Sequence, residues 1–149
     1  YILKKIPLVS KVFQFNSVIG DIKLEYIEFK VLIYEVISKK KNNKIFRNET
    51  KKETITMLVN TYNGHSESID KIPNTLNKYI SKSCIRESKI NEDDLVNVVK
   101  KEIITRLTDR LRYDSIDKVT IQINIVDIKS IYKPYWIADF RGRNIFIDP

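Results

Sequence analysis

The chain has 149 residues, 42% of them hydrophobic and 31% charged, which is the size and composition of one domain with a buried core. This balance, with 10% aromatic residues, excludes a disordered, collagenous or coiled-coil chain. The formal net charge of +8 favours acidic partners, but the lysines are scattered instead of being massed in one segment. We therefore expect a single domain, residues 1–149, whose positive charge mainly maintains solubility.

The N-terminal part of the chain reads as strands. Ile2 to Phe15 has the pattern of one or two short strands interrupted by Pro7, and Asn16 to Asp21 has the composition of a turn. Lys23 to Ser38 mixes β-branched and aromatic residues with alternating charges, which predicts a long strand with one wetter face.

A hairpin is expected next. Lys39 to Lys44 combines turn formers with self-repelling charge and has no apolar face, so it is predicted to be a solvated hairpin tip. Glu53 to Tyr62 is rich in β-branched residues and forms a second strand, which Asn63-Gly64 ends in a tight turn. The lysines of the tip are also candidate contacts for a polyanion: Lys39, Lys40, Lys41 and Lys44.

Two helices are predicted after this strand. Pro73 to Ser83 carries apolar residues at helical spacing, which indicates a short helix of about three turns. The long helix begins after Asn91, an N-cap residue followed by three acids that complement the helix dipole, and it runs to Tyr113. Its apolar stripe recurs every four residues and predicts packing of one face on a sheet: Leu95, Val99, Ile103, Leu107 and Leu111.

The C-terminal part returns to strands. Lys118 to Ile131 alternates apolar and polar residues, so it predicts a long strand, and Pro134 should limit ladder pairing locally. Tyr135 to Phe140 resumes as a strand, Arg141 to Asn144 is a predicted turn, and Ile145 to Ile147 returns.

An internal repeat is suggested by the two hairpins. Phe29 to Val36 aligns without a gap on Tyr132 to Asp139, and Met57 to Asn60 then aligns on Ile145 to Asp148. The alignment relates residues 23–64 to residues 118–149, although any two amphipathic strands resemble one another. If the halves are duplicates, the parent chain should continue past Pro149.

The segment Ile131 to Ile137, followed by a hairpin and Ile147-Asp148, resembles a strand motif of bacterial tandem-hairpin domains, which are similar to PepSY-type and cystatin-like modules. The resemblance implies a curved antiparallel sheet against a helix, often beside membrane segments. The first half departs from it, because Lys30 to Ile33 stands where the second half has Lys133 to Trp136.

Residues capable of catalysis or metal binding are few. His65 is the only histidine, follows a turn and has no neighbouring cysteine, so neither a zinc site nor a Cys-His dyad is expected. Glu92 to Asp94 point in different directions on a helix and are explained by capping. Cys84 cannot form an internal disulfide and is expected to be a small buried residue. We predict no catalytic, cofactor or metal site and therefore no enzyme.

The most suggestive binding cluster combines aromatic and guanidinium groups, which together suit acidic peptides, sugars or bases. Tyr135 and Trp136 must point to opposite faces of a strand, so only one of them can join an exposed patch. Core packing is the competing interpretation. The candidate residues are Tyr132, Tyr135, Trp136, Arg141 and Arg143.

Together these patterns predict an α+β domain, in which an antiparallel sheet of hairpins from two similar halves packs on one long amphipathic helix plus a short helix. The leading hypothesis for function is a non-catalytic binding module that contacts a protein or an envelope component. The alternative is a nucleic-acid-binding domain that uses the basic hairpin tip and Arg106 to Arg112. No transmembrane segment is expected in this chain. Because it begins at Tyr1, we expect a piece of a longer protein. The resemblance implies a bacterial protein, of which this chain would be a cytoplasmic or membrane-adjacent part.

Overall fold

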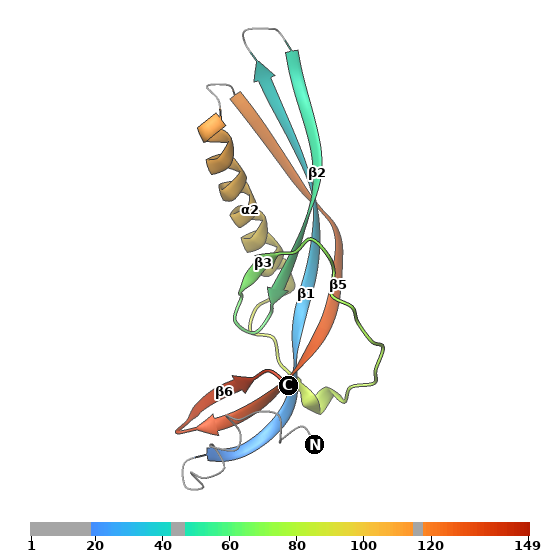
Figure 1. Ribbon diagram of the computed structural model, residues 1–149, viewed down its shortest axis with the longest axis vertical. Coiled ribbons are helices and arrows are strands. Elements are labelled where there is room, and N and C mark those ends of the chain that lie inside the picture. The colour runs from blue at the N-terminus through green and yellow to red at the C-terminus, as the bar shows by residue number, and fades with distance from the viewer. Residues whose placement is uncertain (1–18, 43–46, 115–117) are drawn as a thin grey trace.

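A computed structural model describes residues 19–42, 47–114 and 118–149 (Figure 1). The predicted α+β class is confirmed: a six-stranded sheet packs against one long helix. The strands run in the order β3-β2-β1-β5-β6, and β4 pairs with β1. The elements are β1 (Ile19–Asn42), β2 (Arg47–Asn60), β3 (Ser66–Ser68), the 3-10 turn η2 (Lys82–Cys84), β4 (Ile85–Arg86), α2 (Glu92–Asp114), β5 (Lys118–Phe140) and β6 (Arg143–Ile147).

Two very long antiparallel strands, β1 and β5, form the centre of the sheet and give the molecule its elongated shape (Figure 1). The expected interruption at Pro134 does not occur, because Pro134 is aligned with Tyr26 of β1 inside a continuous strand. Pairing with β6 begins only at Trp136, so at Pro134 strand β5 has a strand neighbour on one side. A proline is tolerated at such an edge, where its missing N–H need not pair.

A β-bulge in β5 was not foreseen. Ile33 of β1 pairs with Asp127 and the next residue, Tyr34, pairs with Ile125, so Val126 is the extra residue of β5. The side chain of Asp127 accepts a hydrogen bond from the Ile128 N–H at 2.9 Å. Bulges bend a strand and increase its twist, which agrees with the strong coiling of β1 and β5 (Figure 1).

Helix α2 covers one face of the sheet, as its apolar stripe predicted. The buried core combines residues of the helix with residues of three strands: Leu32, Tyr34, Val36, Met57, Val59, Leu95, Val99, Ile103, Leu107 and Ile123. Burying each large aliphatic side chain of this set contributes about 2 kcal/mol. The Tyr34 hydroxyl lies within this core and donates to the Val96 carbonyl at 2.9 Å. The helix is therefore fixed to β1 by packing and by one buried hydrogen bond.

The first turn of α2 is held by its cap and by an ion pair with the sheet. Asn91 Oδ1 accepts the Asp93 N–H at 3.1 Å, which confirms the predicted N-cap. Lys30 Nζ of β1 lies 2.6 Å from a Glu92 carboxylate oxygen and 3.1 Å from Glu28. Burial lowers the pKa of Lys30, but the hydrogen bonds to Glu92 and Glu28 outweigh this and raise it.

The short helix predicted over Pro73 to Ser83 is wrong. Residues 69–81 have no helix, and only the three-residue turn η2 follows them. Three apolar residues predict the helix: Leu76 and Tyr79 are 94% and 91% exposed, and Ile80 is half-buried. A helix of three turns is marginal in water unless an apolar face is buried, and this segment leaves most of that face exposed.

Several predicted boundaries also differ. Lys39, Lys40 and Lys41 lie in β1 and not in a hairpin tip, since β1 continues to Asn42. Ile19 to Asp21 belongs to β1 instead of a turn, and Arg143 and Asn144 belong to β6. The turn between β5 and β6 is therefore Arg141-Gly142, both with positive φ, as in the type I′ turn of a tight hairpin. The strands predicted in residues 2–15, and Lys44, lie outside the described residues.

The two hairpins of the suggested repeat are both present but have different registers. In the alignment of the halves, Val59 corresponds to Ile147 and Lys30 to Lys133. Val59 pairs with Lys30, whereas Ile147 pairs with Trp136. The second hairpin is thus shifted relative to the first.

Candidate ligand-binding groove

The segment between β3 and η2 is an extended loop that crosses the sheet and passes beyond β5 (Figure 1). Its start is held by the Ile69 N–H, which donates to the Thr56 carbonyl at 2.9 Å. Its end is held by the Cys84 N–H, which donates to the Ser81 carbonyl at 2.9 Å. We call residues Pro73 to Ile80 of this segment the 73–80 loop.

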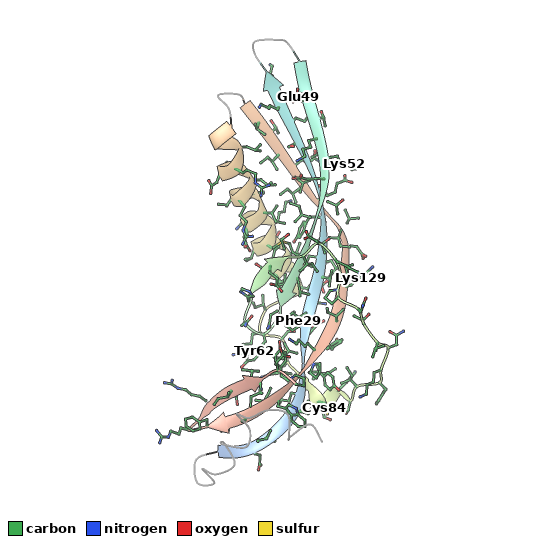
Figure 2. The ribbon with its side chains drawn as sticks, in the orientation of Figure 1. Phe29, Glu49, Lys52, Tyr62, Cys84 and Lys129 are labelled. Atoms are coloured by element: carbon green, nitrogen blue, oxygen red, sulfur yellow. The ribbon has the colours of Figure 1, made fainter. Side chains whose placement is uncertain are left out.

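A groove of ≈ 870 Å³ separates the 73–80 loop from the sheet. Leu58 lies between Met57 and Val59, which are buried against α2, so the side chain of Leu58 projects from the opposite face. The groove therefore uses the sheet face that α2 leaves uncovered. Its walls include residues of β1, β2 and β5: Tyr26, Phe29, Leu58, Asn60, Ser130, Ile131, Tyr132, Lys133, Pro134 and Tyr135. Figure 2 labels Phe29, near the middle of the sheet.

The 73–80 loop presents two large apolar side chains to solvent. Leu76 lines the groove and is 94% exposed, and Tyr79 does not line it but is 91% exposed on the same loop. Single exposed apolar residues are common on protein surfaces, but two beside an apolar groove resemble the side chains that anchor binding interfaces. The geometry suits a ligand with apolar groups.

An aromatic cluster extends the groove toward β6. Tyr135, which lines the groove, packs edge to face on Phe146 with ring centroids 6.3 Å apart, and Phe146 packs on Tyr62 at 5.4 Å. The guanidinium of Arg86 lies 4.9 Å from the centroid of Tyr62 and 5.3 Å from that of Phe146. Arg86 is also paired with Glu25 at 2.9 Å, so its position is fixed by both charge and stacking.

Two lysines add positive charge to this cluster. Lys89 Nζ lies 4.2 Å from the Tyr62 ring centroid, and Lys133 Nζ lies 5.0 Å from that of Tyr135. The hydrogen bond with Lys89, helped by the charge of Arg86, lowers the pKa of Tyr62. Lys133 is paired with Asp148 at 2.7 Å, and this hydrogen bond raises the pKa of Lys133.

The structure divides the predicted aromatic and guanidinium cluster. Tyr132 and Tyr135 line the groove, and Tyr132 is exposed. Trp136 is half-buried and aligned with Ile147. Arg141 and Arg143 are exposed at the β5–β6 turn and do not line the groove.

The predicted basic residues lie at the other end of the molecule, where Figure 2 labels Glu49 and Lys52. Lys39 and Lys41 are exposed in β1, and Lys40 is half-buried. Acidic residues are interleaved with the lysines nearby: Lys51 lies 2.9 Å from Glu53, and Lys52 lies 2.7 Å from Glu35.

The remaining candidate residues have structural positions. His65 is exposed and lines the groove, and its backbone N–H donates to Asn63 Oδ1 at 2.9 Å. Cys84 is half-buried in η2 and is not part of the buried core that was expected for it. Among the described residues, no three His, Cys, Asp or Glu side chains are grouped so that they could hold a metal ion. Within the same ranges, no helix has both the length and the apolar character needed to cross a membrane.

Comparison of the chain with protein-family models, characterised proteins and solved structures finds no significant match. The resemblance to PepSY-type and cystatin-like modules therefore remains a hypothesis that rests on the strand motif alone.

Sequence reasoning missed most of the groove. Leu76 and Tyr79 were assigned to a helix, and Phe29 and Leu58 were assigned to strands without a role. Pro73, Asn74 and Asn77 were the available signal, since prolines and asparagines favour loops over helices. The assembly of the groove from five separate segments has no local signature in the sequence.

Proposed function

We infer that the protein is a non-catalytic interaction module that binds a polypeptide segment in the groove under the 73–80 loop. The observation that carries this inference is the placement of Leu76, 94% exposed, in the wall of a large groove that also contains Phe29, Leu58 and Ile131, with the exposed Tyr79 on the same loop. Covering this apolar surface with a partner provides the main favourable free energy of association.

Peptide is the ligand class that best suits the groove. Its walls combine apolar side chains with the polar residues Asn60 and His65, and both kinds of group are needed to bind a main chain with its side chains. The adjoining aromatic surface of Tyr62 and Tyr135 can accept further apolar residues of the partner.

The test is a selection of random twelve-residue peptides displayed on phage, with the wild-type protein immobilised. Selected peptides should bind the wild type, and the double variant Leu76→Ser/Tyr79→Ser should weaken their affinity at least tenfold, or about 1.4 kcal/mol. Because both side chains are solvated, the variant should keep the wild-type free energy of unfolding within about 0.5 kcal/mol.

Val98→Ala is the matched control, since Val98 is an exposed apolar residue of α2 and does not line the groove. Its affinity for the selected peptides should equal that of the wild type. Failure to select any peptide, or equal binding by the double variant, would contradict the proposed function.

A further inference from the structure

The sheet face opposite α2 continues past the groove along β1, β2 and β5, toward the end of β1 at Asn42 (Figure 1). Val36 of β1 is buried in the core against α2, so its neighbours Glu35 and Ile37 project from the opposite face. The same alternation and the pairing of the three strands give a set of residues that we call the polar face: Glu35, Ile37, Lys39, Lys41, Thr50, Lys52, Thr54, Thr120, Gln122 and Asn124.

The polar face is a regular three-stranded array. Lys39 of β1, for example, lies directly between Thr50 of β2 and Thr120 of β5. Two strand spacings make the array about 10 Å wide, and its length along β1 is about 20 Å. Eight of its ten residues are exposed and the other two are half-buried. In the described part of the chain, therefore, no other segment packs on this face.

The charge of the polar face is positive and partly unpaired. Lys52 lies 2.7 Å from Glu35, so these two charges cancel. The side chains of Lys39 and Lys41 form no ion pair or hydrogen bond within the described ranges. Two uncompensated lysines on a chain of net charge +8 attract a polyanion.

The uncharged groups of the polar face match the edges of DNA base pairs. Amides such as those of Gln122 and Asn124 bind adenine through two hydrogen bonds, and threonine methyl groups contact the methyl group of thymine. Neither amide is hydrogen-bonded to another described residue. A protein partner is a poorer match, because interface cores are apolar and Ile37 is the one aliphatic side chain of the set.

The dimensions of the polar face fit the major groove of a DNA duplex. That groove is about 12 Å wide and accepts β-strands, and a length of about 20 Å covers about six base pairs. Double-stranded RNA is excluded by its narrow major groove. A single strand is disfavoured because its bases stack on aromatic side chains, and the polar face has none.

We propose that the polar face binds duplex DNA by entering its major groove. Lys39 and Lys41 supply the attraction to the phosphates, and the amides of Gln122 and Asn124 hydrogen-bond to base edges. This site goes beyond the proposed function, because no residue of the polar face lines the groove under the 73–80 loop.

This site also differs from the nucleic-acid surface expected from the sequence. That surface combined the basic tip with Arg106 to Arg112. Arg106 belongs to α2, which packs on the opposite face of the sheet, and it is paired with Glu102. One duplex groove therefore cannot contact both the polar face and this part of the helix.

The first experiment measures binding to a fluorescent duplex of about twenty base pairs, by anisotropy, from about 50 to 300 mM salt. Lys39→Gln/Lys41→Gln should weaken binding at least tenfold at about 100 mM salt and lower the salt slope by about 1 to 2. Lys100→Gln/Lys101→Gln is the matched control, since it removes two lysines from α2 on the other side of the sheet. That control should bind within about threefold of the wild type, and both variants should keep the wild-type urea midpoint.

The second experiment tests base reading by selection from duplexes with eight randomised base pairs. The wild type should enrich a preferred sequence. Gln122→Ala/Asn124→Ala should lower the preference for that sequence over a scrambled duplex at least tenfold, with little change in affinity for the scrambled duplex. The groove variant Leu76→Ser/Tyr79→Ser should bind the enriched duplex as the wild type does.

Several results would overturn the proposal. No binding at low salt, equal weakening by the two lysine pairs, or tighter binding to a single strand or to heparin would exclude a polar face made for duplex DNA. Absence of an enriched sequence, or a preference that survives loss of both amides, would exclude base reading. Loss of DNA binding by the groove variant would place the duplex in the groove. The peptide selection is independent of all these measurements, so the proposed function stands or falls separately.

Discussion

Individual side chains in this protein differ sharply in what they contribute, and the tyrosines illustrate it. Tyr34 is 0% exposed and donates its hydroxyl proton to Val96 in the core. Tyr79 is 91% exposed on the 73–80 loop. The same residue type therefore supports the fold at one position and a candidate ligand surface at the other.

Replacement of Tyr34 by Phe removes the buried hydroxyl and leaves the packing of the ring in place. We expect the free energy of unfolding, measured by urea titration, to fall by about 1 kcal/mol, the usual value for one buried hydrogen bond. Tyr79→Phe is the matched control and should change stability by less than about 0.5 kcal/mol. Equal effects of the two substitutions would show that the Tyr34 hydroxyl does not stabilise the fold.

Predictions at the scale of elements were reliable where local pattern and tertiary packing agreed. The stripe from Leu95 to Leu107 predicted α2, and the helix buries that stripe. The equally regular spacing of Leu76 and Tyr79 predicted a helix that does not form, because neither side chain has a surface to pack against. The sequence does not predict the bulge at Val126, because one extra residue changes the strand register without changing the composition of the strand.

The cap of α2 can be tested by Asn91→Ala. This change removes the side-chain oxygen that accepts the Asp93 N–H. The free energy of unfolding, measured by urea titration, should therefore fall by about 1 kcal/mol. Asn97→Ala is the control, because Asn97 is exposed within the same helix and alanine has the higher helix propensity. That variant should be as stable as the wild type or slightly more stable. Similar destabilisation by both changes would contradict a specific capping role.

At the scale of the whole molecule, α2 and the 73–80 loop divide the sheet between structure and binding. One face is covered by the helix and forms the core. The other is partly covered by the loop and forms the groove. The exposed Leu76 and Tyr79 therefore lie on the loop side of the sheet and not on the face that α2 covers.

Stability of the whole molecule should fall in strong alkali. Burial raises the pKa of Tyr34 from 10.0 to about 12, so between these values the folded chain retains a proton that the unfolded chain has lost. The contribution is fully present below pH 10 and is lost as pH rises toward 12, by up to about 3 kcal/mol. Lys30, whose pKa is also raised, adds to the loss in the same direction.

Urea unfolding from pH 8 to pH 12 checks this dependence. The wild type should lose stability steeply above pH 10, and Tyr34→Phe should show a shallower decline because the contribution of the Tyr34 phenol is absent. Parallel declines of the two proteins would show that the Tyr34 phenol does not control alkaline stability.

The sequence by itself determined the α+β class, the strands β1, β2, β5 and β6, the long helix and its cap, because two-residue and four-residue periodicity and capping chemistry are local properties of the chain. It also indicated Tyr132 and Tyr135 as candidate binding residues. Only the tertiary structure decided that Leu76 and Tyr79 stay exposed, that β5 runs through Pro134 with a bulge, and that a groove forms on the sheet face opposite α2. These features depend on which surfaces meet in space, and periodicity along the chain does not specify which surfaces remain without a partner.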